Sequence, residues 1–400
     1  MAGALALTLL LAGCSSSGSN GGGGGTPTPT PVTPVINNVQ PVAVNAGPLN
    51  DQANLLYASV TICVPGTTNC QTINNLQVDT GSSGLRILAS QVTLSLPRST
   101  DAASNPIANC VNFLDSTYMW GPVVTADVKF AGEVASSAPI HLVNPSGFPN
   151  APTSCSTGGS AISGVSDLGA TGILGVSVFA QDCGRACTNT NTTIPAVYYT
   201  CPASGCIPAQ VALNRQLQNP VGLFPQDNNG ILITLPSLPD AGQVSVAGSM
   251  IFGIGTQSNN ALNAARVQTV DSSGNFSTTF NGVKYSKSFI DSGSNALFFL
   301  DAATTKLPAC SNQAKGFYCP TTQTSFTAIT TGINGVAWQI PFNIANALTL
   351  FTSTSNAFNN VGGAQANVFD WGLPFFFGRN VFVALEGTNA AGTIGPYWAY

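Results

Sequence analysis

Charged residues are scarce in this chain of 400 residues: only 6% are Asp, Glu, Lys or Arg, and histidine occurs once. With 11 Lys and Arg against 15 Asp and Glu, the chain has no basic surface to neutralise phosphates, which argues against nucleic acid as a partner. The single histidine, His141, lies in an apolar, strand-like stretch, so neither a Ser-His-Asp nor a Cys-His centre can be assembled. The same scarcity, and the lack of a Cys-x-x-Cys pair, predict that no metal and no cofactor is bound.

Helical periodicity is also scarce, whereas glycine (42) and proline (26) are abundant. Short apolar and β-branched runs are bounded by Gly, Asn and Pro, as is typical of strands joined by turns. The clearest predicted strands are 55–64, 73–78, 123–130, 230–235 and 381–385. The best helical candidate is the short segment 209–217. The pattern predicts an all-β fold and argues against βαβ units.

The N-terminus has features of an export signal. An apolar run over 5–11 leads into Leu-Ala-Gly-Cys, which resembles the lipobox of bacterial lipoproteins. We therefore predict a signal peptide over 1–13, lipidation of Cys14, and a Gly-rich and Thr-Pro tether over 14–34. Ser15 then indicates the outer membrane, so the protein would lie in the bacterial cell envelope, on its periplasmic or surface face, held by lipid alone. The alternative is an unprocessed apolar N-terminus, because the basic residues of a signal peptide are missing.

The cysteines support export. Of the 11 cysteines, Cys14 would be lipidated, which leaves an even number for disulfides. Most of these fall in close pairs and two are left over: Cys63 and Cys70, Cys183 and Cys187, Cys201 and Cys206, Cys310 and Cys319, with Cys110 and Cys155 remaining. Disulfides in an oxidising compartment fit this spacing better than metal binding does. The connectivity stays open.

One motif occurs twice. NNLQVDTGSSGLRIL at 74–88 and SKSFIDSGSNALFFL at 286–300 share an apolar strand that ends in Asp, followed by Thr or Ser, Gly and Ser. Glycine permits a tight turn, and the flanking hydroxyls can hydrogen-bond across to orient the carboxylate. Each copy has a later apolar-Gly companion, at 172–175 and at 369–372. The duplication predicts two related halves with one Asp loop each.

Two such loops can face each other, so that the carboxylates of Asp79 and Asp291 share one site. Like charges at that separation cannot both ionise, so one proton is held between them. The ionised member can accept a proton from water while the protonated member donates one to the carbonyl oxygen of a peptide bond. This chemistry needs no metal or cofactor.

The segment from Tyr57 through the Cys63/Cys70 hairpin to the first loop resembles the N-terminal half of pepsin-like aspartic proteases, and the second loop resembles the other half. The resemblance implies a bilobal all-β fold and a monomer, with lobes that we place at 35–235 and 236–400 on either side of a polypeptide-binding cleft. It implies catalytic roles for Asp79 and Asp291 and supporting roles for their neighbours, which are Thr80, Gly81, Ser82, Ser292, Gly293 and Ser294.

The chain departs from this family at the walls of the cleft. After the first motif the family usually has an aromatic residue, whereas residues 84–87 are Gly-Leu-Arg-Ile. The flap hairpin is expected over 113–121, with Phe113, Tyr118 and Trp120 as candidates to cover substrate. We predict an aspartic endopeptidase that cleaves extended polypeptide. The alternative is a non-catalytic envelope lipoprotein on the same scaffold that binds peptide, glycan or another surface protein.

Overall fold

The structure is a computed structural model that describes residues 37–157, 159–188, 193–311 and 314–400. It confirms the predicted all-β class. The strands are β1 (Val39–Val44), β2 (Leu56–Cys63), β3 (Cys70–Asp79), β4 (Ser83–Leu88), β5 (Ile107–Asn112), β6 (Thr117–Phe130), β7 (Glu133–Val143), β8 (Ser160–Ala161), β9 (Gly172–Val176), β10 (Tyr198–Thr200), β11 (Ile207–Pro208), β12 (Gly230–Thr234), β13 (Val246–Phe252), β14 (Val267–Thr269), β15 (Phe276–Phe280), β16 (Val283–Ile290), β17 (Leu297–Leu300), β18 (Thr324–Thr331), β19 (Ala337–Ile344), β20 (Gly362–Gly363), β21 (Gln365–Trp371), β22 (Asn380–Ala384), β23 (Asn389–Ala390), β24 (Thr393–Ile394) and β25 (Tyr397–Ala399). The described helices are short: α1 (Thr153–Ser156), α2 (Val165–Leu168), α3 (Ala302–Thr305), α4 (Ala347–Phe351) and the 3-10 turns η1 (Ala89–Gln91), η2 (Gly184–Cys187), η3 (Leu213–Arg215), η4 (Pro220–Leu223) and η6 (Leu373–Phe375).

The predicted strands coincide with β2, β3, the second half of β6, β12 and β22. The helix predicted over 209–217 is wrong, because that segment contains only the single turn η3. The side-chain amide of Gln216 donates to the carbonyl oxygens of Val211 (2.9 Å) and Gly184 (3.0 Å), and its backbone is extended. These contacts hold the end of the segment in a non-helical conformation.

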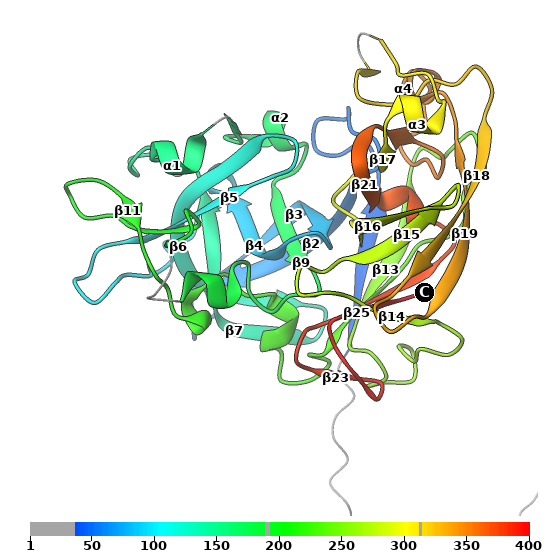
Figure 1. The fold of residues 1–400 in the computed structure, drawn as a ribbon. Coiled ribbons are helices and arrows are strands. Elements are labelled where there is room, and N and C mark those ends of the chain that lie inside the picture. Colours follow the sequence, from blue (N-terminus) through cyan, green and yellow to red (C-terminus); the bar gives the residue numbers. More distant parts are fainter. Residues whose placement is uncertain (1–36, 158, 189–192, 312–313) are drawn as a thin grey trace, which may run out of the picture. The chain divides into compact units, whose positions relative to one another are not determined.

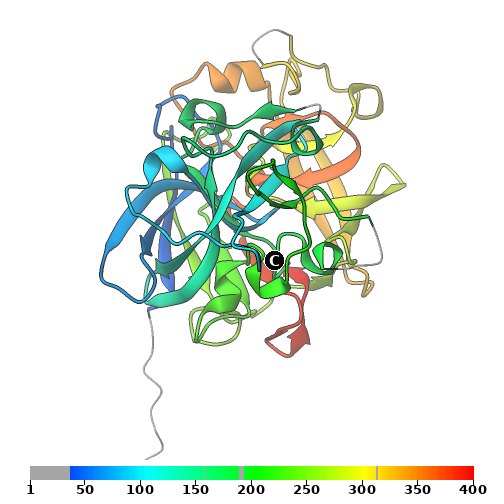
Figure 2. The ribbon, with the colours of Figure 1, turned by 90° about the vertical axis from the view of Figure 1, so that its left-hand side faces the viewer.

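The strands form two large sheets. The first contains strands from both halves of the chain, in the order β11-β10-β5-β6-β7-β4-β9-β3-β2-β1-β13-β12-β22-β25-β14. The halves meet where β1 pairs with β2 on one side and with β13 on the other. The second sheet, β19-β18-β15-β16-β21-β17-β20, uses only strands that follow β14. Figure 1 shows β2 to β7 on the left and β15 to β19 on the right. In Figure 2 the blue to green strands face the viewer.

Each Asp loop occupies the same place in its own sheet. β3 pairs in parallel with β9, which also pairs antiparallel with β4. β16 pairs in parallel with β21, which also pairs antiparallel with β17. The first loop therefore joins two strands that flank β9, and the second joins two strands that flank β21. The sequence duplication corresponds to a duplicated three-strand arrangement.

Five disulfides are present, as the cysteine count predicted: Cys63–Cys70, Cys110–Cys155, Cys183–Cys187, Cys201–Cys206 and Cys310–Cys319. Cys14, the signal peptide and the tether lie outside the described residues. Within the described ranges, no helix has the length and apolar character needed to span a membrane. The predicted lobe boundary at 235/236 falls between β12 and β13, which are neighbours in the shared sheet, and it stays a prediction.

Candidate active site

The two predicted carboxyl groups face each other. Oδ1 of Asp79 accepts the backbone N–H of Gly81, and Oδ1 of Asp291 accepts that of Gly293, both at 2.7 Å. The Asp79 side chain is also hydrogen-bonded to Asp291. A Cβ atom placed on Gly293 would lie 2.7 Å from Oδ1 of Asp79 and 3.0 Å from Oδ1 of Asp291. Glycine is required there because a side chain would enter the space between the carboxyls.

The Asp291 carboxyl of this pair has a strongly shifted pKa. The pKa of Asp291 is raised well above its ordinary value, first by burial, then by the negative charge of Asp79 and then by that of Asp370. Burial and the nearby negative charges favour the protonated form of Asp291, which makes it the candidate acid of the pair. By accessible surface Asp291 is half-buried, whereas Asp79 is 7% exposed. The site thus combines a carboxyl of raised pKa with partial access to solvent.

Reciprocal hydrogen bonds join the two loops beneath the carboxyls. The backbone N–H of Thr80 donates to Oγ of Ser292 (3.1 Å), and that of Ser292 donates to Oγ1 of Thr80 (2.9 Å). Each hydroxyl donates in turn across the site, from Thr80 to the carbonyl oxygen of Ile290 (3.2 Å) and from Ser292 to that of Val78 (2.7 Å). Thr80 is 2% exposed and Ser292 0%. Every donor of this buried set has its acceptor in the other half of the chain, so the loops fix each other's position.

Outer hydroxyls complete both carboxyl environments. Ser82 donates to Oδ2 of Asp79, and Ser294 donates to Oδ2 of Asp291 at 3.1 Å. The structure thus brings all the predicted loop residues together, while their roles in catalysis stay predictions. Sequence reasoning missed Gln77, whose side-chain amide donates to the carbonyl oxygen of Gly293 at 2.7 Å. A polar side chain between the apolar Leu76 and Val78, directly before the Asp motif, was the available signal.

A third carboxyl group adjoins the pair. Asp370 lies in β21, is 2% exposed, and its Oδ2 is 2.6 Å from Oγ of Ser294. Burial raises its pKa well above the ordinary value; the hydrogen bond with Ser294 opposes this rise, and the charge of Asp79 adds to it. Sequence reasoning treated 369–372 only as an apolar-Gly companion. The signal was an acidic residue inside an apolar motif.

The wall after the first loop is built around a buried arginine. Arg86 is 1% exposed, donates to the carbonyl oxygen of Ser83 (2.7 Å) and forms an ion pair with Asp182 (3.2 Å). Asp182 also accepts the hydroxyl of Tyr198 (2.6 Å) and the amide of Asn109 (2.9 Å). Burial raises the pKa of Asp182, although the ion pair with Arg86 opposes the rise. Where the family that the chain resembles usually has an aromatic side chain, a charged network supports the loop.

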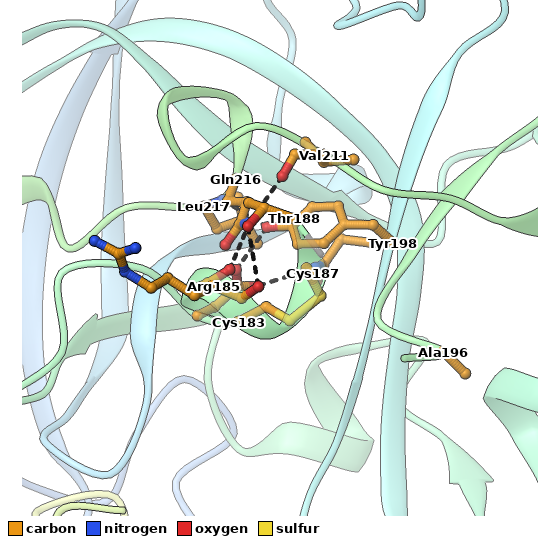
Figure 3. The surroundings of a disulfide bond; sticks show 12 residues. Cys183, Arg185, Cys187, Thr188, Ala196, Tyr198, Val211, Gln216 and Leu217 are labelled. Carbon is orange, nitrogen blue, oxygen red and sulfur yellow. Dashed lines mark hydrogen bonds between the residues drawn. A yellow bond between two sulfur atoms is a disulfide. The ribbon is translucent and has the colours of Figure 1, made fainter. Parts of the chain in front are cut away.

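The Cys183–Cys187 disulfide closes a short loop directly after Asp182 of this network. Figure 3 shows the Cys183–Cys187 bond beside Tyr198, Gln216 and Leu217. The backbone N–H of Leu217 donates to the hydroxyl of Tyr198 at 2.6 Å. A Cβ atom on Gly84, which has φ +95°, would lie 2.8 Å from Cβ of Leu217. Leu217, which is hydrogen-bonded to Tyr198 of the network, therefore packs close to β4, the strand that leaves the first Asp loop.

The three flap candidates lie on the β5–β6 hairpin and pack mainly against neighbouring segments of the chain. Phe113 contacts an apolar cluster with Met119. Trp120 packs against Tyr199 at 5.1 Å between ring centroids, and its indole N–H donates to the carbonyl oxygen of Pro149 (2.7 Å). Tyr118 and Trp120 line a cavity of about 260 Å³. At the hairpin turn the exposed apolar residue is Leu114, 75% exposed, which sequence reasoning did not single out.

Other chemistries lack their groups in the described part of the chain. His141 is fully buried in β7, and burial together with nearby Arg86 lowers its pKa well below the ordinary value. It is therefore neutral and enclosed. No group of three His, Cys, Asp or Glu side chains suited to a metal ion occurs among the described residues.

Comparisons with known proteins agree with this geometry at the level of the fold. The crystal structure of an aspartic proteinase from Irpex lacteus superimposes with a TM-score of 0.50 at 15% identity, over 90% of this chain and 96% of that one. The fold is that of the pepsin-like aspartic proteinases. The chain belongs to the family described as "protein of unknown function (DUF3443)", which it matches over residues 34–400. A search of curated proteins finds no match.

Proposed function

We propose that the protein is an aspartic endopeptidase that hydrolyses peptide bonds in extended polypeptides. The observation that carries the proposal is the facing pair of Asp79 and Asp291, in which burial and the charges of Asp79 and Asp370 raise the pKa of Asp291. Glycine N–H groups, outer serine hydroxyls and the reciprocal Thr80–Ser292 bonds hold both carboxyls in position. Such a pre-organised acid and base fit water-mediated hydrolysis.

In the proposed reaction the carboxylate of Asp79 accepts a proton from a water molecule, whose oxygen bonds to the carbonyl carbon. Asp291 donates its proton to the carbonyl oxygen, which gives a neutral tetrahedral intermediate. Asp79 then returns its proton to the departing nitrogen while Asp291 takes one back from a hydroxyl of the intermediate; the C–N bond breaks, and an amine and a carboxylic acid are released. No bond forms between protein and substrate.

The β5–β6 hairpin is the proposed flap. Its turn carries Leu114, the exposed apolar side chain that would contact substrate. Tyr118 and Trp120 are held by their own packing partners, and they would support the hairpin rather than cover the dyad. The modified wall at Arg86 would give this site a different side-chain preference from that of relatives with an aromatic residue there.

We also propose that the protein is exported, lipidated at Cys14 and tethered as a monomer in the cell envelope. The disulfides support an oxidising compartment. Loss of the protein from the membrane fraction in a Cys14→Ser variant would support the anchor, whereas unchanged membrane association would contradict it.

The function is tested with purified protein and an unfolded polypeptide substrate across about pH 3 to 8. Asp79→Asn and Asp291→Asn should each lower the cleavage rate by about a hundredfold or more, because each removes half of the acid–base pair. Asp271→Asn is the matched control, since Asp271 lies in an exposed turn where Asn can still accept the N–H groups of Ser273 and Asn275. All variants are checked for folding by their unfolding midpoint.

Undiminished cleavage in both dyad variants would contradict the mechanism. Folded protein that cleaves at no pH and does not bind a pepstatin-type transition-state analogue would instead favour the non-catalytic envelope lipoprotein. Because the pKa of Asp291 is raised, we expect activity to persist well above about pH 4, the ordinary carboxyl range, and to fall where Asp291 loses its proton.

A further inference from the structure

Asp370 is a buried acid with little to stabilise a negative charge. In β21 it lies opposite Phe289 of β16 on one side and Phe298 of β17 on the other. Its Oδ2 contacts Ser294, whereas its Oδ1 has no hydrogen-bond partner among the described residues. An isolated buried carboxylate is costly, so the neutral acid is the favoured form.

The hydroxyl of Ser294 stands between two carboxyl groups. Its Oγ is 2.6 Å from Oδ2 of Asp370 and 3.1 Å from Oδ2 of Asp291. A hydroxyl has one hydrogen, so it can donate along only one of these bonds and must accept along the other. A carboxyl donates only when it is protonated. The geometry therefore requires a proton on Asp370 or on the facing oxygen of Asp291 if both bonds are made.

The first half of the chain has no such group. Ile173 pairs with Gln77, two residues before Asp79, just as Asp370 pairs with Phe289, two residues before Asp291. Ile173 and Asp370 thus occupy equivalent places in the duplicated arrangement. In the first half an apolar side chain fills the position, and the described contacts of the Ser82 hydroxyl are with Asp79. The acid is specific to the loop that carries the protonated member of the pair.

We propose that Asp370 exchanges a proton with Asp291 through the hydroxyl of Ser294, so that the site works with three carboxyl groups instead of two. In the exchange the O–H bond of Asp370 breaks as its proton passes to Oγ of Ser294. The serine's own hydrogen passes at the same time to Oδ2 of Asp291. Asp370 becomes a carboxylate, Ser294 remains a hydroxyl, and Asp291 is reprotonated. Asp370 is a positioning residue, since it acts through Ser294.

The charged groups around Asp370 are the two dyad carboxyls. Asp79 raises the pKa of Asp370, and Asp370 raises that of Asp291. On the neighbouring strand β16, Lys284 and Lys287 are exposed. The ring of Tyr285 packs on Phe369, the residue before Asp370, so it meets the opposite face of β21. Strand β17 contributes only apolar side chains, and η6 contains no titratable residue.

The inference rests on the proposed peptidase function and is tested first by the pH profile of kcat/KM. Asp370→Asn keeps the size of the side chain, and Asp370→Ile copies the equivalent Ile173; neither can release a proton or carry a charge. At the alkaline limb the wild type can hold a proton on Asp291 while Asp370 is the carboxylate, which raises the pKa of Asp291; neither variant can form that carboxylate, so the limb should move to lower pH by about one unit. Such a shift lowers kcat/KM by about tenfold at pH values above the alkaline limb. Asp271→Asn should leave the profile unchanged.

A second measurement needs no activity. A carboxyl whose folded pKa is raised stabilises the fold fully below its unfolded pKa, and this contribution is lost as pH rises through the folded pKa. The unfolding midpoint of the wild type should therefore fall relative to that of Asp370→Asn above about pH 4, by roughly 2 °C per pH unit. A purely structural Asp370 would give the same difference at every pH.

The outcomes separate the two proposals. If the wild type cleaves nothing but loses stability relative to Asp370→Asn as pH rises, Asp370 is protonated as inferred and the peptidase function is wrong. If the wild type cleaves and both variants of Asp370 keep its pH profile and its pH dependence of unfolding, the proton exchange is wrong and the peptidase function stands.

Discussion

The two carboxyls can approach each other because the glycines of the Asp loops have no side chain. Gly81 and Gly293 each border the carboxyl of the opposite loop: a Cβ on Gly81 would lie 2.7 Å from Cγ of Asp291. Neither glycine has a positive φ. They are needed for close approach, and the free space they leave is where two carboxyls can share a proton.

We expect Gly293→Ala to reduce cleavage by about a hundredfold or more, because the new methyl group displaces Asp79 from its partner and disturbs the acid–base pair. Gly164→Ala is the matched control. Gly164 has an extended backbone, and a Cβ there meets only Oγ of Ser166, at 3.9 Å. Steady-state kinetics of both variants provide the measurement. Equal activity in the two would show that the carboxyls do not need this spacing.

Sequence reasoning identified the loop residues because each copy of the motif is local and appears twice. It missed Asp370 and Gln77 because their importance depends on which strands become neighbours. Asp370 reaches Ser294, 76 positions away along the chain, and Gln77 reaches Gly293, 216 positions away. Nothing in local periodicity predicts such contacts.

Strand β4 depends on the ion pair between Arg86 and Asp182. Both side chains are almost completely buried, so the pair has lost its hydration and each charge relies on the other. The predicted strands were correct because their short apolar and β-branched runs are bounded by turn residues. The charged network was not predicted, since Asn109, Asp182 and Tyr198 come from separate segments.

Arg86→Met should lower the free energy of unfolding by about 3–5 kcal/mol at neutral pH, because it leaves Asp182 buried without its counter-ion. The variant raises the folded pKa of Asp182 further, so its stability declines as pH rises through that pKa. The loss should therefore be smaller at about pH 4 than at about pH 7. Urea unfolding at both values measures it. Adding Asp182→Asn should restore stability at pH 7; a double variant as unstable as the single one would refute the charge argument.

The described strands, taken together, confirm the all-β, pepsin-like fold that the duplicated motif suggested. The order of the sheets was not predictable in the same way. β1 joins the two halves by pairing with both β2 and β13, and its six residues carry no motif. Its position depends on the completed edges of both neighbours, which form only in the folded chain.

The disulfides should differ in what they contribute to the stability of the fold. The Cys110–Cys155 bond spans 45 residues, and Cys183–Cys187 spans 4. From loop entropy, replacing both cysteines by alanine should cost about 4 kcal/mol for the first pair and about 2 kcal/mol for the second. Denaturant unfolding of the two double variants measures the difference. A larger loss for the shorter loop would show that local contacts, not chain entropy, dominate.

The reciprocal hydrogen bonds between Thr80 and Ser292 also link the exchange of their two amide hydrogens with solvent. Each amide hydrogen is held by the hydroxyl of the other residue, so neither can be released while its partner stays in place. Both should exchange deuterium at one common rate, that of the rare event in which the two Asp loops separate. The exchange rate of the two amides would thus report how often the site opens.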